Sequence, residues 1–127
     1  MITQISCSKV HQELGPGFPE KVYQSALITS LRTADLSVER ERRFKVMFEE
    51  ITVGEFKVDL LVEGRVVVEV KAVTGPMPKV FAAQLLAYLK AAKLPVGLLV
   101  NFGNASCQVK RVVLSSVESV LKSAKSS

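Results

Sequence analysis

The alternation of apolar and polar side chains in residues 56–72 constrains the fold more than any other feature of this chain. Every even-numbered position in 56–62 and 66–72 is apolar: Phe56, Val58, Leu60, Val62, Val66, Val68, Val70 and Ala72. Successive side chains of a β-strand point to opposite faces, so each half predicts a strand with one apolar face. If both faces join the same core, even residues pair with even residues. That pairing requires an odd-length loop at Glu63-Gly64, such as three residues with a left-handed glycine, or a bulge.

The opposite face of this predicted hairpin carries Asp59, Glu69 and Lys71. With an odd-length loop these side chains cluster, and they are costly on a buried sheet unless they face a partner, a metal or a cleft. Two carboxylates can hold a divalent cation while a lysine polarises a water or stabilises a developing oxyanion. These are the catalytic groups of a metal-dependent phosphodiesterase. The alternative is a solvent-exposed polar face with a chance salt bridge.

Hydrophobic periodicity and turn residues predict the remaining elements. We expect helices at residues 2–14, 19–34 and 79–92, and strands at residues 36–48, 52–62, 65–72, 95–102 and 108–113. Pro19 is expected at a first helical position, with Glu20 in the first turn. Ser115 and Glu118 resemble a capping box that begins a last helix, and residues 123–127 are expected to fray. This order predicts one α/β domain over residues 1–127, with helices flanking a mixed central sheet.

The composition limits the class of protein. The chain has 127 residues, of which 48% are apolar and 23% charged, as in ordinary globular domains. No apolar run approaches the ~18 residues of a membrane span, and the N-terminus lacks a secretory pattern, so we expect a cytoplasmic protein. The net charge of +5 favours polyanionic partners such as nucleic acid. The densest basic run, residues 40–45, is either the solvated face of a strand or a set of phosphate contacts.

The cysteines and the single histidine give weaker signals. Cys7 and Cys107 are far apart in sequence and match no metal-binding spacing, so we interpret both as reduced packing residues. One histidine and no cysteine pair argue against a zinc site. His11 precedes a glycine turn, and we interpret it as a helix-end or core residue rather than a catalytic base.

Two of the predicted helices carry further candidates for a site. Gln84 and Tyr88 are four residues apart and therefore share a helix face. They are either boundary residues beside a core stripe or side chains that point at the carboxylates of the hairpin. Glu20 lies three residues before Tyr23, on nearly the same face, and is either a favourable first-turn charge or a third carboxylate.

Several of these segments resemble a known family. Residues 17–23, Gly-Phe-Pro-Glu-Lys-Val-Tyr, match the pattern after which GxxExxY proteins are named. Residues 59–62, 69–73, 84–89 and 97–103 are similar to the later blocks of that family, in the same order. The resemblance covers about residues 11–113. The family is placed in the PD-(D/E)XK nuclease-like superfamily, which implies a restriction-endonuclease-like core of mixed sheet and flanking helices.

The resemblance also implies roles for individual residues. Asp59, Glu69 and Lys71 take the metal-site positions, and Glu20 is the additional acid of the first core helix. The residues implied on the following helix are Gln84 and Tyr88. Val58 stands where the name of the superfamily has a proline, a position at which many members lack it.

These observations predict a metal-dependent nuclease or nuclease-like phosphodiesterase. Asp59 and Glu69 would bind one or two Mg²⁺ ions, or Mn²⁺, and the further ligands would be the backbone carbonyl of Val70 and the carboxylate of Glu20. Lys71 would assist the attacking water. Gln84 would position a water or a phosphate, and Tyr88 would hold the helix or the substrate.

Two other hypotheses remain open from the sequence. The chain could be a catalytically silent module on the same scaffold that binds nucleic acid or a protein, as its positive charge and small size suggest. It could also form a homodimer through a sheet edge or the valine-rich hairpin.

Overall fold

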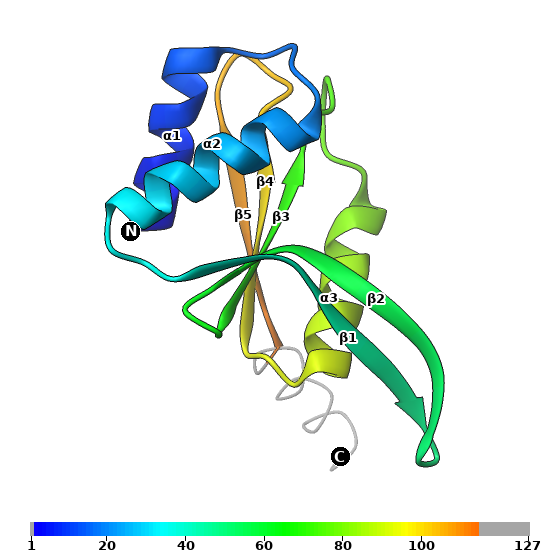
Figure 1. The fold of residues 1–127 in the computed structure, drawn as a ribbon. Coiled ribbons are helices and arrows are strands. Elements are labelled where there is room, and N and C mark those ends of the chain that lie inside the picture. The colour runs from blue at the N-terminus through cyan, green and yellow to red at the C-terminus, as the bar shows by residue number, and fades with distance from the viewer. Residues whose placement is uncertain (1, 115–127) are drawn as a thin grey trace, which may run out of the picture.

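A computed structural model describes residues 2–114 as a mixed five-stranded sheet between two helical layers (Figure 1). The elements are α1 (Ile2–Leu14), α2 (Glu20–Thr33), β1 (Val38–Phe48), β2 (Ile51–Val62), β3 (Val66–Lys71), α3 (Lys79–Ala92), β4 (Val96–Asn101) and β5 (Gln108–Val113). The strand order is β1-β2-β3-β4-β5; β3 and β4 are parallel and the other neighbours antiparallel. The predicted α/β class is therefore confirmed. The helix predicted from Ser115 lies outside the described residues.

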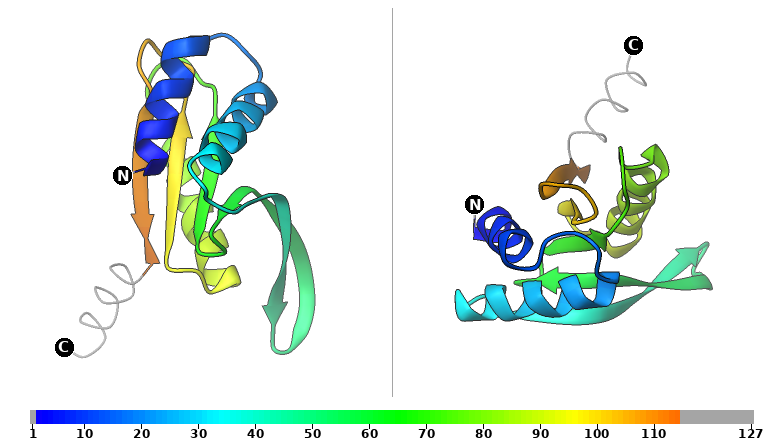
Figure 2. Two further views of the ribbon diagram at one scale, coloured as in Figure 1. Left: turned by 60° about the vertical axis from the view of Figure 1, so that its left-hand side comes forward. Right: turned by 90° about the horizontal axis from the view of Figure 1, so that it is seen from above.

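The helices occupy both faces of the sheet, with α1 and α2 on one side and α3 on the other (Figure 2). α3 is the crossover that a parallel pair of strands requires between β3 and β4. It has the predicted bounds: it follows Pro78 and ends where Lys93 adopts a left-handed conformation with φ of 57°. α2 begins one residue later than predicted, because Pro19 is extended and caps the helix instead of opening it. Within residues 2–114, no helix has the length and apolarity needed to cross a membrane.

The register of the β2–β3 hairpin confirms the predicted pairing. Val62 pairs with Val66 and Leu60 with Val68, so even residues face even residues. The loop between the strands has three residues, and Glu63 and Gly64 adopt φ of 54° and 63°. Glycine takes this left-handed conformation without the steric penalty that a Cβ brings. The odd-length loop therefore puts the two valine-rich faces on the same side of the sheet.

The even-numbered face does not, however, serve a single core. Leu60 belongs to the cluster under α1 and α2, whereas Val58, two residues earlier, belongs to the cluster under α3. The physical reason is the length of β2, which has 12 residues against 6 in β3. Beyond Leu60, β2 pairs with β1 alone, and two-stranded ribbons twist more strongly than wider sheets. The ribbon therefore turns its apolar face toward α3, past which it runs in Figure 1.

Two buried clusters result from this arrangement. The first packs α1 and α2 on the sheet, and its centre is Tyr23, whose ring stacks on Phe102 with centroids 4.6 Å apart. The second packs α3 on the other face and contains Val58, Leu61, Val67, Leu85, Leu89 and Leu99. The ribbon joins the second cluster through Phe56, which stacks on Tyr88 at 4.3 Å. Burial of each such side chain contributes roughly 1.5–3 kcal/mol.

Two asparagines hold the segment that leaves β3. Asn101, fully buried, accepts a hydrogen bond from Val73 N and donates one to Val73 O, both at 2.9 Å. Asn104 forms the same pair of bonds with Gly75, both at 2.8 Å. Each side-chain amide thus replaces the backbone partner that a neighbouring strand would have supplied. No sequence pattern predicted these bonds, although an asparagine at the end of the apolar run of β4 is the signal that could have indicated them.

Gly103 allows this approach, and its replacement is a test of the packing. A Cβ at Gly103 would overlap the backbone of Val73. We expect Gly103→Ala to lower the free energy of unfolding by about 1–3 kcal/mol, because the overlap must be relieved by moving a backbone that Asn101 holds. Gly54→Ala in β2 is the matched control, since a Cβ there meets open space. Urea denaturation of both variants provides the measurement, and equal midpoints would contradict the expected packing.

Candidate functional site

Asp59 and Glu69 lie side by side at the point where β2 separates from β3. Backbone pairing of the two strands is last seen at Leu60 and Val68. Beyond that point, Asp59 N donates to Glu69 Oε2 at 2.8 Å, and Val70 N donates to Asp59 Oδ2 at 2.8 Å. The carboxylates therefore take the place of backbone carbonyls as acceptors while the strands diverge. This exchange fixes the position of both acidic groups relative to the sheet.

Glu69 is the more deeply buried of the two acids, with 6% of its surface exposed. Burial, and after it the adjacent charge of Asp59, raise the pKa of its carboxyl to about 8, against the smaller opposing effects of the Asp59 N–H and Lys71. A carboxyl with this pKa holds a proton at neutral pH. A bound cation would lower the pKa of Glu69 and release that proton, because the cation compensates the two adjacent negative charges.

Lys71 follows Glu69 by two residues on β3 and therefore points to the same side of the sheet. Its ammonium lies 4.5 Å from the centre of the Phe81 ring, which belongs to α3. The positive charge of Lys71 lowers the pKa of Glu69 and of Glu20, so it lies within electrostatic reach of both. The ion pairs found within residues 2–114 all lie on the β1–β2 ribbon, which leaves the Lys71 ammonium without a fixed carboxylate partner in that part of the chain.

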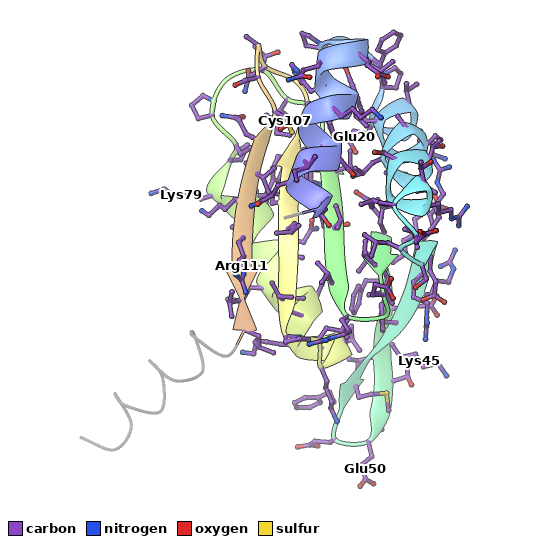
Figure 3. All side chains as sticks on the ribbon, turned by 90° about the vertical axis from the view of Figure 1, so that its left-hand side faces the viewer. Glu20, Lys45, Glu50, Lys79, Cys107 and Arg111 are labelled. Carbon is purple, nitrogen blue, oxygen red and sulfur yellow. The ribbon has the colours of Figure 1, made fainter. Side chains whose placement is uncertain are left out.

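Glu20 reaches the same region from α2, where Figure 3 labels it. Burial raises the pKa of Glu20; Lys71 lowers it and Asp59 raises it. Glu20 is therefore near enough to the hairpin residues for their charges to act on it, and its role as a third carboxylate stays a prediction. A turn before the helix places it there: Gly15 and Gly17 adopt φ of 68° and 116°.

Tyr23 holds this turn in place. Its hydroxyl donates to Gly15 O and accepts from Phe18 N. The side chain is fully buried. The glycine, glutamate and tyrosine of residues 17–23 thus have separate physical roles: one turns the chain, one lies within electrostatic reach of Lys71 and Asp59, and one fixes the turn.

Tyr88 of α3 completes the described surroundings. Burial raises its pKa, and the charges of Glu69 and Asp59 raise it further, so its hydroxyl lies within reach of both acids. Gln84, one helical turn earlier, is exposed, and its amide forms no hydrogen bond with any residue in 2–114. The structure therefore brings Tyr88 to the acids, while contact between Gln84 and the acids stays a prediction.

His11 and the basic run lie outside this cluster. His11 is buried, and its Nε2 is 2.7 Å from Asn104 O, which agrees with its interpretation as a core residue. In the basic run, Arg42 pairs with Glu39 and Arg43 with Glu55, at 3.1 and 3.0 Å. Arg40 instead donates to Ser25 and Gln24 of α2. Phosphate contact by this run stays a prediction.

The acidic pair offers donors that suit a hard divalent cation. No cluster of three or more Asp, Glu, His or Cys side chains suited to a metal ion occurs within residues 2–114. Mg²⁺, however, is commonly held by one or two carboxylates, with waters and substrate phosphates as the other ligands. In Asp59 and Glu69, one oxygen of each carboxylate accepts a backbone N–H and the other has no such bond in the described part of the chain. The residues present therefore fit a magnesium ion of this kind.

The raised pKa of Glu69 predicts how stability depends on pH. The unfolded chain ionises near the ordinary value of 4.5 and the folded chain near 8, so between these values the folded state binds more protons. Stability without metal should therefore fall by a few kcal/mol in order of magnitude as pH rises from about 4.5 to 8. Glu69→Gln should remove most of this fall and should be more stable than wild type at pH 9. Urea denaturation at pH 6 and pH 9 measures the effect.

Glu55→Gln provides the control for this experiment. Glu55 is an exposed carboxylate paired with Arg43, so its replacement changes the net charge equally without touching the acidic pair. We expect Glu55→Gln to keep the wild-type pH dependence. The same pH dependence in wild type and Glu69→Gln would show that Glu69 is ionised at neutral pH.

Comparisons with known proteins concern the fold and the family of this chain. The crystal structure of SSO0001 is similar over 73% of this chain and 50% of that one, with a TM-score of 0.54 and 16% identity, a likeness that concerns the fold. This chain thus corresponds to about half the length of that protein. No match was found among curated proteins. The model of a family described as the PD-(D/E)XK nuclease superfamily matches residues 2–112, so the chain belongs to that superfamily.

Proposed function

We propose that this protein is a metal-dependent, nuclease-like phosphodiesterase of the GxxExxY group that acts on nucleic acid. The observation that carries the proposal is the interlocked pair of Asp59 and Glu69, with Lys71 two residues further along the same strand. The strongly raised pKa of buried Glu69 lowers stability at neutral pH, and groups with such shifts cluster at functional sites. Membership of a nuclease superfamily makes phosphodiester hydrolysis the reaction to test first.

In this proposal, Asp59 and Glu69 hold Mg²⁺ or Mn²⁺ together with the Val70 carbonyl. Because no cluster of three acids suited to a metal occurs within residues 2–114, Glu20 acts on the ion through its charge. The ion would act as a Lewis acid on the phosphate and would neutralise the charge that develops there. The protein contributes rigidity: each carboxylate is fixed by a backbone N–H at 2.8 Å, so little reorganisation is needed when substrate arrives.

Lys71 supplies the mobile positive charge of the site. Its ammonium orients the attacking water, assists removal of a proton from that water and stabilises the crowded phosphate. The Phe81 ring holds the ammonium through a cation–π contact without consuming its hydrogen-bond donors. Gln84 positions a water or a phosphate from the exposed face of α3, and Tyr88 holds α3 and the substrate beside the acids.

A cleavage assay tests the enzymatic part of the proposal. The purified chain is incubated with single-stranded, duplex and structured DNA and RNA in Mg²⁺ or Mn²⁺. We expect at least one substrate to be cut, and Lys71→Ala to lower the rate by about 10²-fold or more, because proton transfer and charge stabilisation at the phosphate are lost. Lys45→Ala removes the same charge from exposed strand β1 and should leave the rate unchanged.

The assay also separates this proposal from a silent binding module. If no substrate is cut, or if Lys71→Ala cuts as fast as wild type, the enzymatic reading fails. Salt-sensitive binding of DNA or RNA that survives Asp59→Ala and Glu69→Ala would then identify a nucleic-acid-binding module. Light scattering on the same samples tests whether the protein is a dimer.

Metal binding has its own expected signature. Since Glu69 holds a proton at neutral pH, Mg²⁺ must displace it, and the apparent affinity should rise about tenfold per pH unit up to about pH 8. Saturating Mg²⁺ at 100 times its Kd should stabilise the fold by about 2.7 kcal/mol. Thermal unfolding at several pH values and Mg²⁺ concentrations measures both effects. Glu69→Gln and Asp59→Asn should show neither, whereas Glu55→Gln should respond as wild type.

A further inference from the structure

Cys7 and Cys107, which are far apart in sequence, belong to the same part of the fold. Cys7 lies on α1 and is fully buried in the cluster under α1 and α2. Cys107 immediately precedes β5, is partly exposed and packs against the same cluster. Both are free, the Cys107 side chain packs against the cluster that contains Cys7, and each thiol shifts the pKa of the other. Figure 3 labels Cys107 beside α1.

A second contact independently fixes this approach. His11 is one helical turn after Cys7 and so lies on the same face of α1. Its Nε2 is 2.7 Å from Asn104 O, and its ring stacks near that of Phe102, at 6.3 Å between centroids. Asn104 and Cys107 both belong to the connection between β4 and β5. Two successive turns of α1 therefore pack near one connection, the residues between β4 and β5 that include Asn104 and Cys107.

The two thiols differ in reactivity. The interaction with Cys7 lowers the pKa of the Cys107 thiol, against the opposing effect of burial. The interaction with Cys107 raises the pKa of the Cys7 thiol, and burial raises it further. Cys107 is thus the better nucleophile and is also the accessible one, since peroxides react with thiolates. Cys7 is placed to attack the Cys107 sulfur after Cys107 has been oxidised.

We propose that Cys7 and Cys107 are a redox-active pair that forms a reversible intramolecular disulfide when the protein meets a peroxide. The Cys107 thiolate sulfur attacks one peroxide oxygen, the O–O bond breaks, and hydroxide leaves and takes up a proton as water, which yields a sulfenic acid on Cys107. The Cys7 sulfur then attacks the Cys107 sulfur, the S–O bond breaks, and hydroxide leaves with the Cys7 proton as a second water. Two thiols are oxidised and one peroxide is reduced.

The disulfide would fasten α1 to the opposite end of the chain. It would close a loop of about 100 residues, for which the loss of unfolded-state entropy is large. It would also lie next to the Asn104 bonds that hold Gly75. The pair neither touches the acidic residues nor depends on the proposed hydrolysis, so the two proposals fail independently.

Intact-mass analysis of the full-length protein tests the pair. The reduced chain is freed of reductant and treated under native conditions with one equivalent of hydrogen peroxide. We expect a loss of about 2 Da in the monomer, a proteolytic fragment that links Cys7 to Cys107, and return to the starting mass with dithiothreitol. A gain of about 16 Da per oxygen in place of the loss, a disulfide between two chains, or unreacted thiols would each overturn the proposal.

Two substitutions assign the roles of the sulfurs. With Cys7→Ser, peroxide should leave a Cys107 sulfenic acid that dimedone traps. With Cys107→Ser, buried Cys7 should not react while the chain stays folded, as checked by circular dichroism. The reverse pattern would overturn the assignment of Cys107 as nucleophile. In wild type, oxidation should raise the Tm by about 10 °C, an effect that dithiothreitol abolishes.

Discussion

The exchange of hydrogen bonds between Asp59 and Glu69 is the interaction on which the rest of this structure depends. Two carboxylates side by side under a helix are unfavourable, because each loses hydration and each repels the other. They are retained because each accepts a backbone N–H at 2.8 Å, which gives one oxygen of each group a hydrogen-bond partner. The residual strain is visible in the pKa of Glu69, which rises to about 8. A position that lowers stability while being so firmly fixed is what a functional site requires.

The same exchange allows β2 to leave the sheet. Once side-chain oxygens replace carbonyls as acceptors, β2 no longer follows β3 and continues as a ribbon with β1. The ribbon then packs on α3 through Phe56 and Tyr88. Without this departure, Phe56 would not stack on Tyr88, and α3 would lack the contact that holds Tyr88 near the acids. The second core and the site therefore have one origin.

The sequence predicted the local parts of this arrangement and missed the parts that depend on twist or on distant contacts. The alternation of apolar and polar side chains in residues 56–72 predicted even-to-even pairing and a three-residue or bulged loop. The same alternation could not show that Val58 and Leu60 belong to different cores, because that depends on the twist of the β1–β2 ribbon beyond the end of β3. The proximity of Cys7 and Cys107 depends on how α1 docks near β5, which no local pattern encodes.

The position of Glu20 depends on a chain of contacts that begins at Lys71. Phe102 N donates to Lys71 O at 2.9 Å, which fixes the end of β4 to the end of β3 at Lys71 itself. The Phe102 ring stacks on Tyr23, and the Tyr23 hydroxyl holds the glycine turn that opens α2. Glu20 is three residues from Tyr23 on that helix. A rigid path of one backbone bond, one ring stack and one helical turn therefore connects Lys71 to Glu20. Glu20 comes within electrostatic reach of Lys71 because the buried tyrosine is fixed, which accounts for the spacing of glycine, glutamate and tyrosine in residues 17–23.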